Sequence, residues 1–150
     1  MYLLYNLDME NQATKIELQV GVKILLKNEE GKYLLIRRNP KKYPEVGPKW
    51  DIVGGRINPG APLMENLARE VDEETKLKIT SEPVLIGAQD ILKVLGRHVV
   101  RLTYLGNTTG NPVIDEESLE FKWFTEKEIR AMTTEVLDSY FSRLLDKAFI

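Results

Sequence analysis

Three glutamates, Glu70, Glu73 and Glu74, stand close together in the segment Arg69-Glu70-Val71-Asp72-Glu73-Glu74. If this segment is helical, they fall at i, i+3 and i+4, and their carboxylates share one face. These like charges repel one another, and the negative end of the helix dipole adds to the penalty. A divalent cation would reverse both effects, and clustered carboxylate oxygens suit Mg²⁺ or Mn²⁺ better than zinc. The spacing therefore indicates a metal site, with an acidic, solvent-exposed helix face as the alternative.

Hydrophobic periodicity indicates the elements that would position these glutamates. Apolar residues at period two predict a strand over residues 17–27, and turn residues at 28–31 connect it to a second strand at 33–36, forming a hairpin. Residues 39–49 are rich in proline and lysine and read as a loop. A short strand over 50–53 then leads into the glycine pair Gly54-Gly55. A helix is predicted to begin near Pro62, with a core-facing stripe at Leu63, Leu67 and Val71.

The second half of the chain predicts further strands followed by helices. Two strands, over 84–94 and 98–105, are expected to form a hairpin at Gly96, and a short strand follows over 121–124. Thr125 and Glu128 have the spacing of a capping box, so a short helix begins there. The apolar spacing from Leu137 to Ala148 predicts one amphipathic final helix. This order indicates an α+β or α/β fold in which helices pack on a mixed sheet.

Length and composition narrow the functional class. A chain of 150 residues with no internal linker is expected to form a single domain over 1–150. The net charge of −2 gives no general attraction to long nucleic acid or to an anionic membrane. The absence of cysteine excludes disulfides and thiolate chemistry and fits a cytoplasmic location. The opening Met1–Tyr5 segment is apolar but is not a convincing signal peptide, and no run is long enough to span a bilayer.

The segment from Gly55 to Leu77 resembles the Nudix box, G-x5-E-x7-R-E-U-x-E-E-x-G-U, in which U is a bulky apolar residue. The matching positions are Gly55, Arg69, Glu70, Val71, Glu73, Glu74 and Leu77. Two positions differ, because Ala61 replaces the first glutamate of the box and Lys76 replaces its last glycine. Trp50 and Trp123-Phe124 are also similar to residues that flank the box in this family. The resemblance, of MutT type, implies a Nudix-like α/β/α sandwich with a mixed β-sheet.

The two departures from the box have different consequences. In the family the first glutamate lies near the box arginine and supports the loop–helix geometry, so Ala61 predicts a less firmly held Arg69. The family glycine usually ends the helix in the left-handed conformation, so either Lys76 adopts it at a cost on the order of 1 kcal/mol or the helix ends differently. Neither departure removes the Arg-Glu-x-x-Glu-Glu core of the box.

The resemblance implies hydrolysis of a diphosphate bond in a nucleoside diphosphate linked to another moiety, with Mg²⁺ or Mn²⁺ as cofactor. The metal ligands that it implies are the carbonyl of Gly55 and the carboxylates of Glu70, Glu73 and Glu74. Arg69 would orient Glu70 through a charge-assisted hydrogen bond, with a surface i, i+4 pair to Glu65 or Glu73 as the alternative. Glu70 or Glu74 is a candidate general base. The substrate would be a small nucleotide, and a homodimer is left open because dimers are common among relatives.

Residues outside the box complete the hypothesis. A second acidic cluster precedes Trp123, and in it Glu116 or Glu117 is a candidate loop base, with a solvated loop as the alternative. Basic residues of the loop that leads into the box are candidates for phosphate binding, although exposed lysines often only aid solubility. These candidates are Arg37, Arg38, Lys49 and Arg56. Tyr43 is either a base-stacking residue or an ordinary loop aromatic.

Three other interpretations compete with the hydrolase. A Nudix-like module that binds a nucleotide or ADP-ribose without cleaving it is favoured by Ala61 and Lys76, but it has no need for three repelling glutamates. The isomerase branch that acts on isopentenyl diphosphate relies on a cysteine, which this chain lacks. RNA decapping is disfavoured by the net negative charge, since long RNA usually requires a basic surface.

Overall fold

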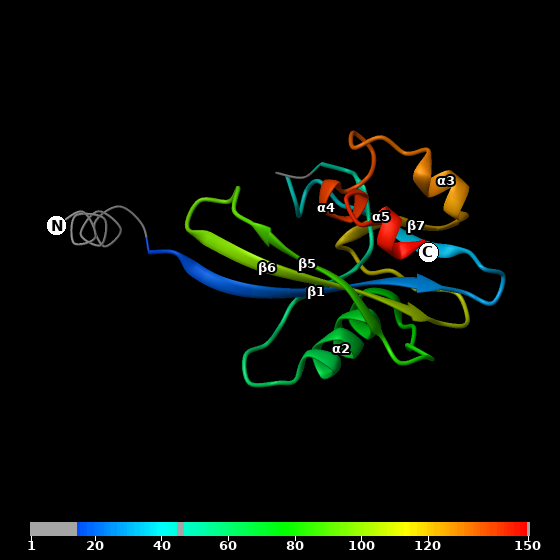
Figure 1. Ribbon diagram of the computed structural model, residues 1–150, viewed down its shortest axis with the longest axis horizontal. Coiled ribbons are helices and arrows are strands. Elements are labelled where there is room, and N and C mark those ends of the chain that lie inside the picture. The colour runs from blue at the N-terminus through cyan, green and yellow to red at the C-terminus, as the bar shows by residue number, and fades with distance from the viewer. Residues whose placement is uncertain (1–14, 45–46, 150) are drawn as a thin grey trace.

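The computed structural model describes residues 15–44 and 47–149, and it shows a mixed sheet of seven strands with helices on both faces (Figure 1). The strands are β1 (Glu17–Lys27), β2 (Tyr33–Arg38), β3 (Trp50–Asp51), β4 (Val53–Arg56), β5 (Val84–Ile91), β6 (Arg97–Asn107) and β7 (Ser118–Phe124). Their order is β3-β2-β1-β6-β5, with β4 also paired to β1 and β7 to β2. The predicted α+β class and the layering of helices on a mixed sheet are therefore confirmed. The segment Met1–Tyr5 lies outside the described residues.

Strand β1 is the centre of the sheet, because it pairs in parallel with β6 and antiparallel with β2 and β4. Its alternating side chains enter two cores. Ile24 and Leu26 pack in the core that also holds Leu67 and Val71, whereas Leu25 packs with Phe141 on the opposite face. The odd-numbered face of β1 also carries Lys23, which is only 8% exposed. A buried lysine in a central strand requires polar partners, and these form part of the site described below.

Helix α2 (Leu63–Thr75) carries the acidic motif and covers one face of the sheet. The stripe predicted for it is wrong at Leu63, which is 38% exposed, whereas Leu67 and Val71 are fully buried. Asn66, Glu74 and Thr75 are buried instead, so the inward face is rotated and partly polar. The helix ends at Lys76, whose φ of 61° places it in the left-handed region. The conformation considered for Lys76 from the sequence is therefore the one observed.

The C-terminal region covers the opposite face of the sheet (Figure 1). Helix α3 (Glu126–Arg130) begins with the predicted capping box between Thr125 and Glu128. The single final helix predicted from Leu137 is wrong, because α4 (Ser139–Ser142) and α5 (Leu145–Ala148) are separate. The turn tightens at Leu144, whose amide donates to the carbonyl of Phe141 at 2.9 Å and whose side chain lies against Gly87.

Several element boundaries also differ from those expected. The strand predicted over 50–53 is divided into β3 and β4, β5 ends at Ile91 rather than at 94, and β2 and β7 are longer than predicted. Among the described residues, no helix is both long and apolar enough to cross a membrane.

Candidate active site

The glycine pair within β4 allows this strand to approach β1 and α2 closely. Gly54 has a φ of 142°, and a Cβ atom there would overlap the carbonyl oxygen of Val22 on β1. A Cβ atom on Gly55 would lie 2.6 Å from Oε2 of Glu70, the first box carboxylate on α2. A side chain at either position would therefore separate β4 from β1 or from α2.

Arg69 links the loop, the helix and two of the three box carboxylates. Its Nη1 donates to Glu70 at 3.0 Å and to Glu73 at 3.2 Å, and its Nη2 donates to Asn66 and to the carbonyl of Arg56. The predicted pairing of Arg69 with Glu70 is thus present. Burial and the nearby charge of Glu74 raise the pKa of Glu70, although Arg69 opposes both effects.

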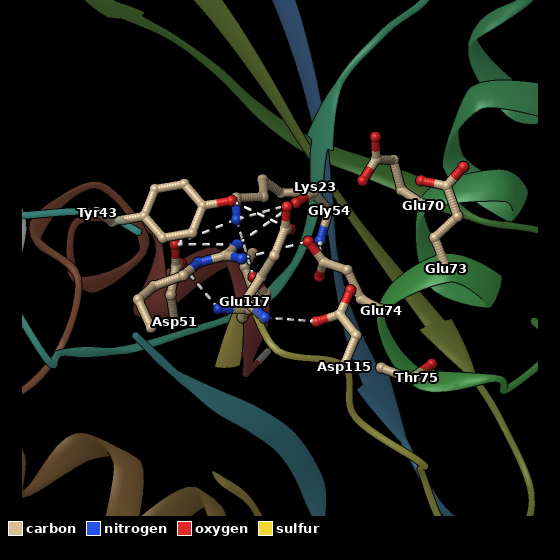
Figure 2. Close-up of polar contacts among 12 residues, drawn as sticks. Lys23, Tyr43, Asp51, Gly54, Glu70, Glu73, Glu74, Thr75, Asp115 and Glu117 are labelled. Carbon is tan, nitrogen blue, oxygen red and sulfur yellow. Dashed lines mark hydrogen bonds and ion pairs between the residues drawn. The ribbon is translucent and has the colours of Figure 1, made fainter. Parts of the chain in front are cut away.

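Glu74 points away from the other two box carboxylates (Figure 2). It is 4% exposed, and it accepts hydrogen bonds from Arg38 Nη1 at 3.2 Å and from the amide of Gly54 at 3.2 Å. Glu70 and Glu73 instead extend from α2 together, so the shared face predicted from the spacing holds only for this pair. The ion pair with Arg38 explains the difference, because a buried carboxylate requires a charged or hydrogen-bonding partner.

The donor set suits a hard divalent ion, but it is not assembled around one point. Within residues 15–44 and 47–149, no three Asp, Glu or His side chains meet closely enough to hold a metal ion. Glu70 and Glu74 are occupied by Arg69 and Arg38, which a metal ion would have to displace or complement. Glu70, Glu73 and Glu74 nevertheless fit magnesium by their chemistry, because all three are carboxylates and a cation would relieve their mutual repulsion. The role of the Gly55 carbonyl stays a prediction.

A buried charge network that the sequence analysis missed lies near Gly54, and Figure 2 labels two of its members, Lys23 and Asp51. Asp51 pairs with Lys23 at 3.1 Å and with Arg101 at 3.2 Å, and Arg101 also pairs with Asp138 at 3.1 Å. These residues come from β1, β3, β6 and the segment before α4. The parallel pairing of β1 with β6 places Lys23 and Arg101 on neighbouring strands, and the amide of Asp138 donates to the carbonyl of Trp50 in β3 at 2.8 Å. The sign of this network in the sequence is that charged residues stand at inward positions of strands whose other inward residues are apolar.

The network shifts several pKa values. Although burial opposes ionisation of Asp51, the surrounding cations, Lys23 first, hold its pKa well below the usual range. Burial and the charge of Arg38 lower the pKa of Lys23 to about 8. Burial and the charge of Asp51 raise the pKa of Asp138. Glu74 and Asp51 raise the pKa of Arg38 in spite of its burial.

A cavity of about 600 Å³ connects this network with the box. The box residues Gly55, Arg69, Glu70, Glu73 and Glu74 line one part, and Lys23, Asp51, Arg101 and Asp138 line another. Of the predicted phosphate ligands, Arg38, Lys49 and Arg56 line it. Arg37 does not, because alternation along β2 directs it to Glu120, with which it pairs at 3.0 Å.

The second acidic cluster contributes one residue to the cavity. Glu117 lines it and accepts a hydrogen bond from the hydroxyl of Tyr43 at 3.1 Å, whereas Glu116 extends to Lys42 at 3.6 Å with its side chain 81% exposed. Burial raises the pKa of Tyr43 to about 12. The amide of Asn39 also donates to the carbonyl of Glu117, so this loop is anchored to the loop that leads into the box.

Comparison with known proteins identifies the family. The family model of the NUDIX domain matches residues 17–145. The chain belongs to the Nudix hydrolase family. A curated relative of this Nudix chain, "Putative nudix hydrolase 1" of Caenorhabditis elegans, is 30% identical over 134 residues. That match covers 86% of the chain but only 34% of the relative, so the chain spans about a third of that protein.

Solved Nudix structures share the fold. The MutT protein from Methanosarcina mazei Go1 superposes with a TM-score of 0.76 and 27% identity, over 90% of this chain and 95% of that one. The MutT NUDIX hydrolase from Burkholderia pseudomallei gives a TM-score of 0.70 and 22% identity, over 87% of this chain and 98% of that one. The second similarity concerns the fold alone.

Proposed function

We propose that this Nudix protein is a metal-dependent pyrophosphohydrolase that cleaves a diphosphate bond in a nucleoside diphosphate derivative. Nudix hydrolases generally act on such compounds, and the substrate of this chain would be a small nucleotide. The observation that carries the proposal is the single cavity that holds the box carboxylates together with buried cations. A diphosphate needs both groups, because its own negative charge must be neutralised before water can attack it.

The cavity assigns different tasks to its cations and its carboxylates. Arg38, Lys49 and Arg56 would bind the phosphate oxygens, and the guanidinium groups can do so with two parallel hydrogen bonds. Glu70, Glu73 and Glu74, with the Gly55 carbonyl, would hold Mg²⁺ or Mn²⁺. When bound, the ion would screen the phosphoryl charge and acidify a water molecule.

Two carboxylates of the cavity would be the candidates to accept the proton of the attacking water. Glu70 lines the cavity beside the other box carboxylates, and Arg69 holds its carboxylate at 3.0 Å. Glu117 enters the same cavity from the opposite loop, and Tyr43 holds its carboxylate. Glu116, with its side chain on the surface, is the weaker candidate for the loop base.

A nucleotide-binding module without hydrolytic activity is the second candidate. The specific observation in its favour is the ion pair between Arg38 and Glu74, which occupies one of the three box carboxylates. A protein of this kind would bind ADP-ribose or a nucleotide through the cavity cations and release no product. A cytoplasmic location and a homodimer also stay predictions.

Product chromatography over a nucleotide panel with Mg²⁺ or Mn²⁺ tests the hydrolase. Glu73→Gln is the informative variant, because its side chain is 56% exposed and its loss should leave the fold intact. We expect turnover to fall by a factor on the order of 10²–10⁴. Glu65→Gln, an exposed change in the first turn of the same helix, is the matched control and should keep full activity. A silent panel with ligand-induced thermal stabilisation would favour the binding module.

A further inference from the structure

Asn66 is a buried polar residue of α2 whose side chain uses both ends of its carboxamide. It is 1% exposed. Its Nδ2 donates to the carbonyls of Ala61 and Pro62, each at 3.0 Å. Its Oδ1 accepts from the amide of Asn58 at 2.7 Å and from Arg69 Nη2 at 3.0 Å. A carboxamide has two donor hydrogens and one oxygen with two lone pairs, and all four are used.

These contacts connect the turn before the helix to the box arginine. Pro62, at the N-cap of α2, has no side-chain group that could cap the helix. The side chain of Asn66 instead connects the turn over 58–62 to α2 through its hydrogen bonds to Asn58 and Ala61. The same oxygen holds Nη2 of Arg69, while Nη1 contacts Glu70 and Glu73. Because a guanidinium group is planar and rigid, fixing one edge of Arg69 also orients the edge that contacts the carboxylates.

We propose that Asn66 is a positioning residue that supports Arg69 in place of the box glutamate that Ala61 replaces, and thereby sets Glu70 and Glu73 for metal binding. The inference rests on the proposed metal-dependent function. Asn66 is neutral, so it orients Arg69 without adding a negative charge beside it. Partners of this kind, one step removed from the ligands, usually change metal affinity or activity 10–100-fold when they are lost.

Four variants separate this role from simple support of the helix. Asn66→Ala removes the contact with Arg69 and the contacts with the turn. Asn66→Asp keeps an acceptor for Arg69 but loses the donors to the turn. Asn66→Ala combined with Ala61→Glu supplies a carboxylate from the position where the family has one. Thr75→Val is the control for destabilisation of α2, because it removes the 2.6 Å hydrogen bond to Val71 without touching Arg69.

The measurements are Mn²⁺ affinity by isothermal titration calorimetry, kcat on the substrate identified in the panel, and the melting temperature. For Asn66→Ala we expect Mn²⁺ affinity to fall 10–100-fold. Addition of Ala61→Glu should recover most of that affinity without restoring the melting temperature. Asn66→Asp should lower the melting temperature and keep Mn²⁺ affinity close to wild type, as should Thr75→Val.

Two results would overturn the proposal. In the first, Asn66→Ala melts earlier, as Thr75→Val does, but binds Mn²⁺ as the wild type does, which would make Asn66 a structural residue only. In the second, Ala61→Glu fails to recover any affinity in the Asn66→Ala background. If the wild-type protein neither binds Mn²⁺ nor releases product, the proposed function itself is wrong. If only the proposal for Asn66 is wrong, the wild type still binds Mn²⁺, so the two failures are distinguishable.

Discussion

The ion pair between Arg38 and Glu74 should be the most sensitive point of the site. The two side chains are 9% and 6% exposed, and Nη1 of Arg38 lies 3.2 Å from Oε1 of Glu74. Arg38→Met removes the cation and leaves Glu74 with the amide of Gly54 as its remaining hydrogen-bond donor among the described residues. Removing one partner of a buried pair typically costs about 3–5 kcal/mol, because the other charge stays buried without compensation.

For a chain of this length, that loss corresponds to a melting temperature lower by roughly 10–15 °C. Urea denaturation at neutral pH measures the free energy of unfolding directly. The double variant Arg38→Met with Glu74→Met should recover much of the stability, because two apolar side chains of similar volume leave no uncompensated charge. Saturating Mg²⁺ should stabilise Arg38→Met more than the wild type, since the ion would replace the missing positive charge next to Glu74.

Arg37→Met is the matched control on the same strand. Arg37 pairs with Glu120 at 3.0 Å, but the two side chains are 31% and 50% exposed. Its loss should cost less than about 1 kcal/mol, as for other pairs near the surface. If Arg38→Met cost no more than Arg37→Met, the buried pair would not stabilise the site and the assignment of Glu74 to it would be wrong.

Three further predictions concern single positions. Lys76 has a φ of 61°, a left-handed conformation that glycine adopts more easily than lysine. Lys76→Gly should therefore raise the free energy of unfolding in urea denaturation by about 1 kcal/mol and leave turnover unchanged. Unchanged stability would mean that the conformation of Lys76 is not strained. Glu117→Gln should lower kcat by about 10²-fold, whereas Glu116→Gln should not, and equal effects would exclude the loop base. As pH rises through about 8, Lys23 loses its charge in the cavity, so KM for an anionic substrate should increase. In Lys23→Met this pH-dependent increase in KM should disappear, and if it persists, another group causes it.

Local patterns predicted those parts of the molecule that depend on neighbouring residues in the chain. The period of two in residues 17–27 gave β1 with the observed ends, and Thr125 with Glu128 gave the capping box. Lys76 could be placed because it stands at the position of the box glycine, which usually ends the helix in the left-handed conformation. The final helix failed for the opposite reason. Leu144, at the interruption, contacts Gly87 of β5, and no local pattern shows such a long-range contact.

The candidate site shows the same division. The spacing of Glu70, Glu73 and Glu74 placed them together on α2, yet it could not show which of them would be taken by Arg38 from β2. Alternation along β2 would have separated Arg37 from Arg38, but only pairing with the other strands shows which of the two faces the cavity. The placement of residues on one element was therefore predictable from the sequence, whereas the partners on other elements that neutralise their charges were not.

The buried network gives a physical reason why this site needs more than its helix. Three box carboxylates repel one another, and the structure neutralises the buried Glu74 by placing Arg38 beside it, in addition to the hydrogen bond from the amide of Gly54. Arg38 in turn lies 4.0 Å from Asp51. Asp51 is then shared with Lys23 and Arg101, so cations and carboxylates alternate from α2 across the sheet to β6. A phosphate that binds Arg38 would weaken its hold on Glu74, and that carboxylate would then need another cation. If Arg38 binds phosphate and Glu74 binds metal as proposed, the arrangement would couple anion binding at Arg38 to metal binding at Glu74, in the direction that favours both together.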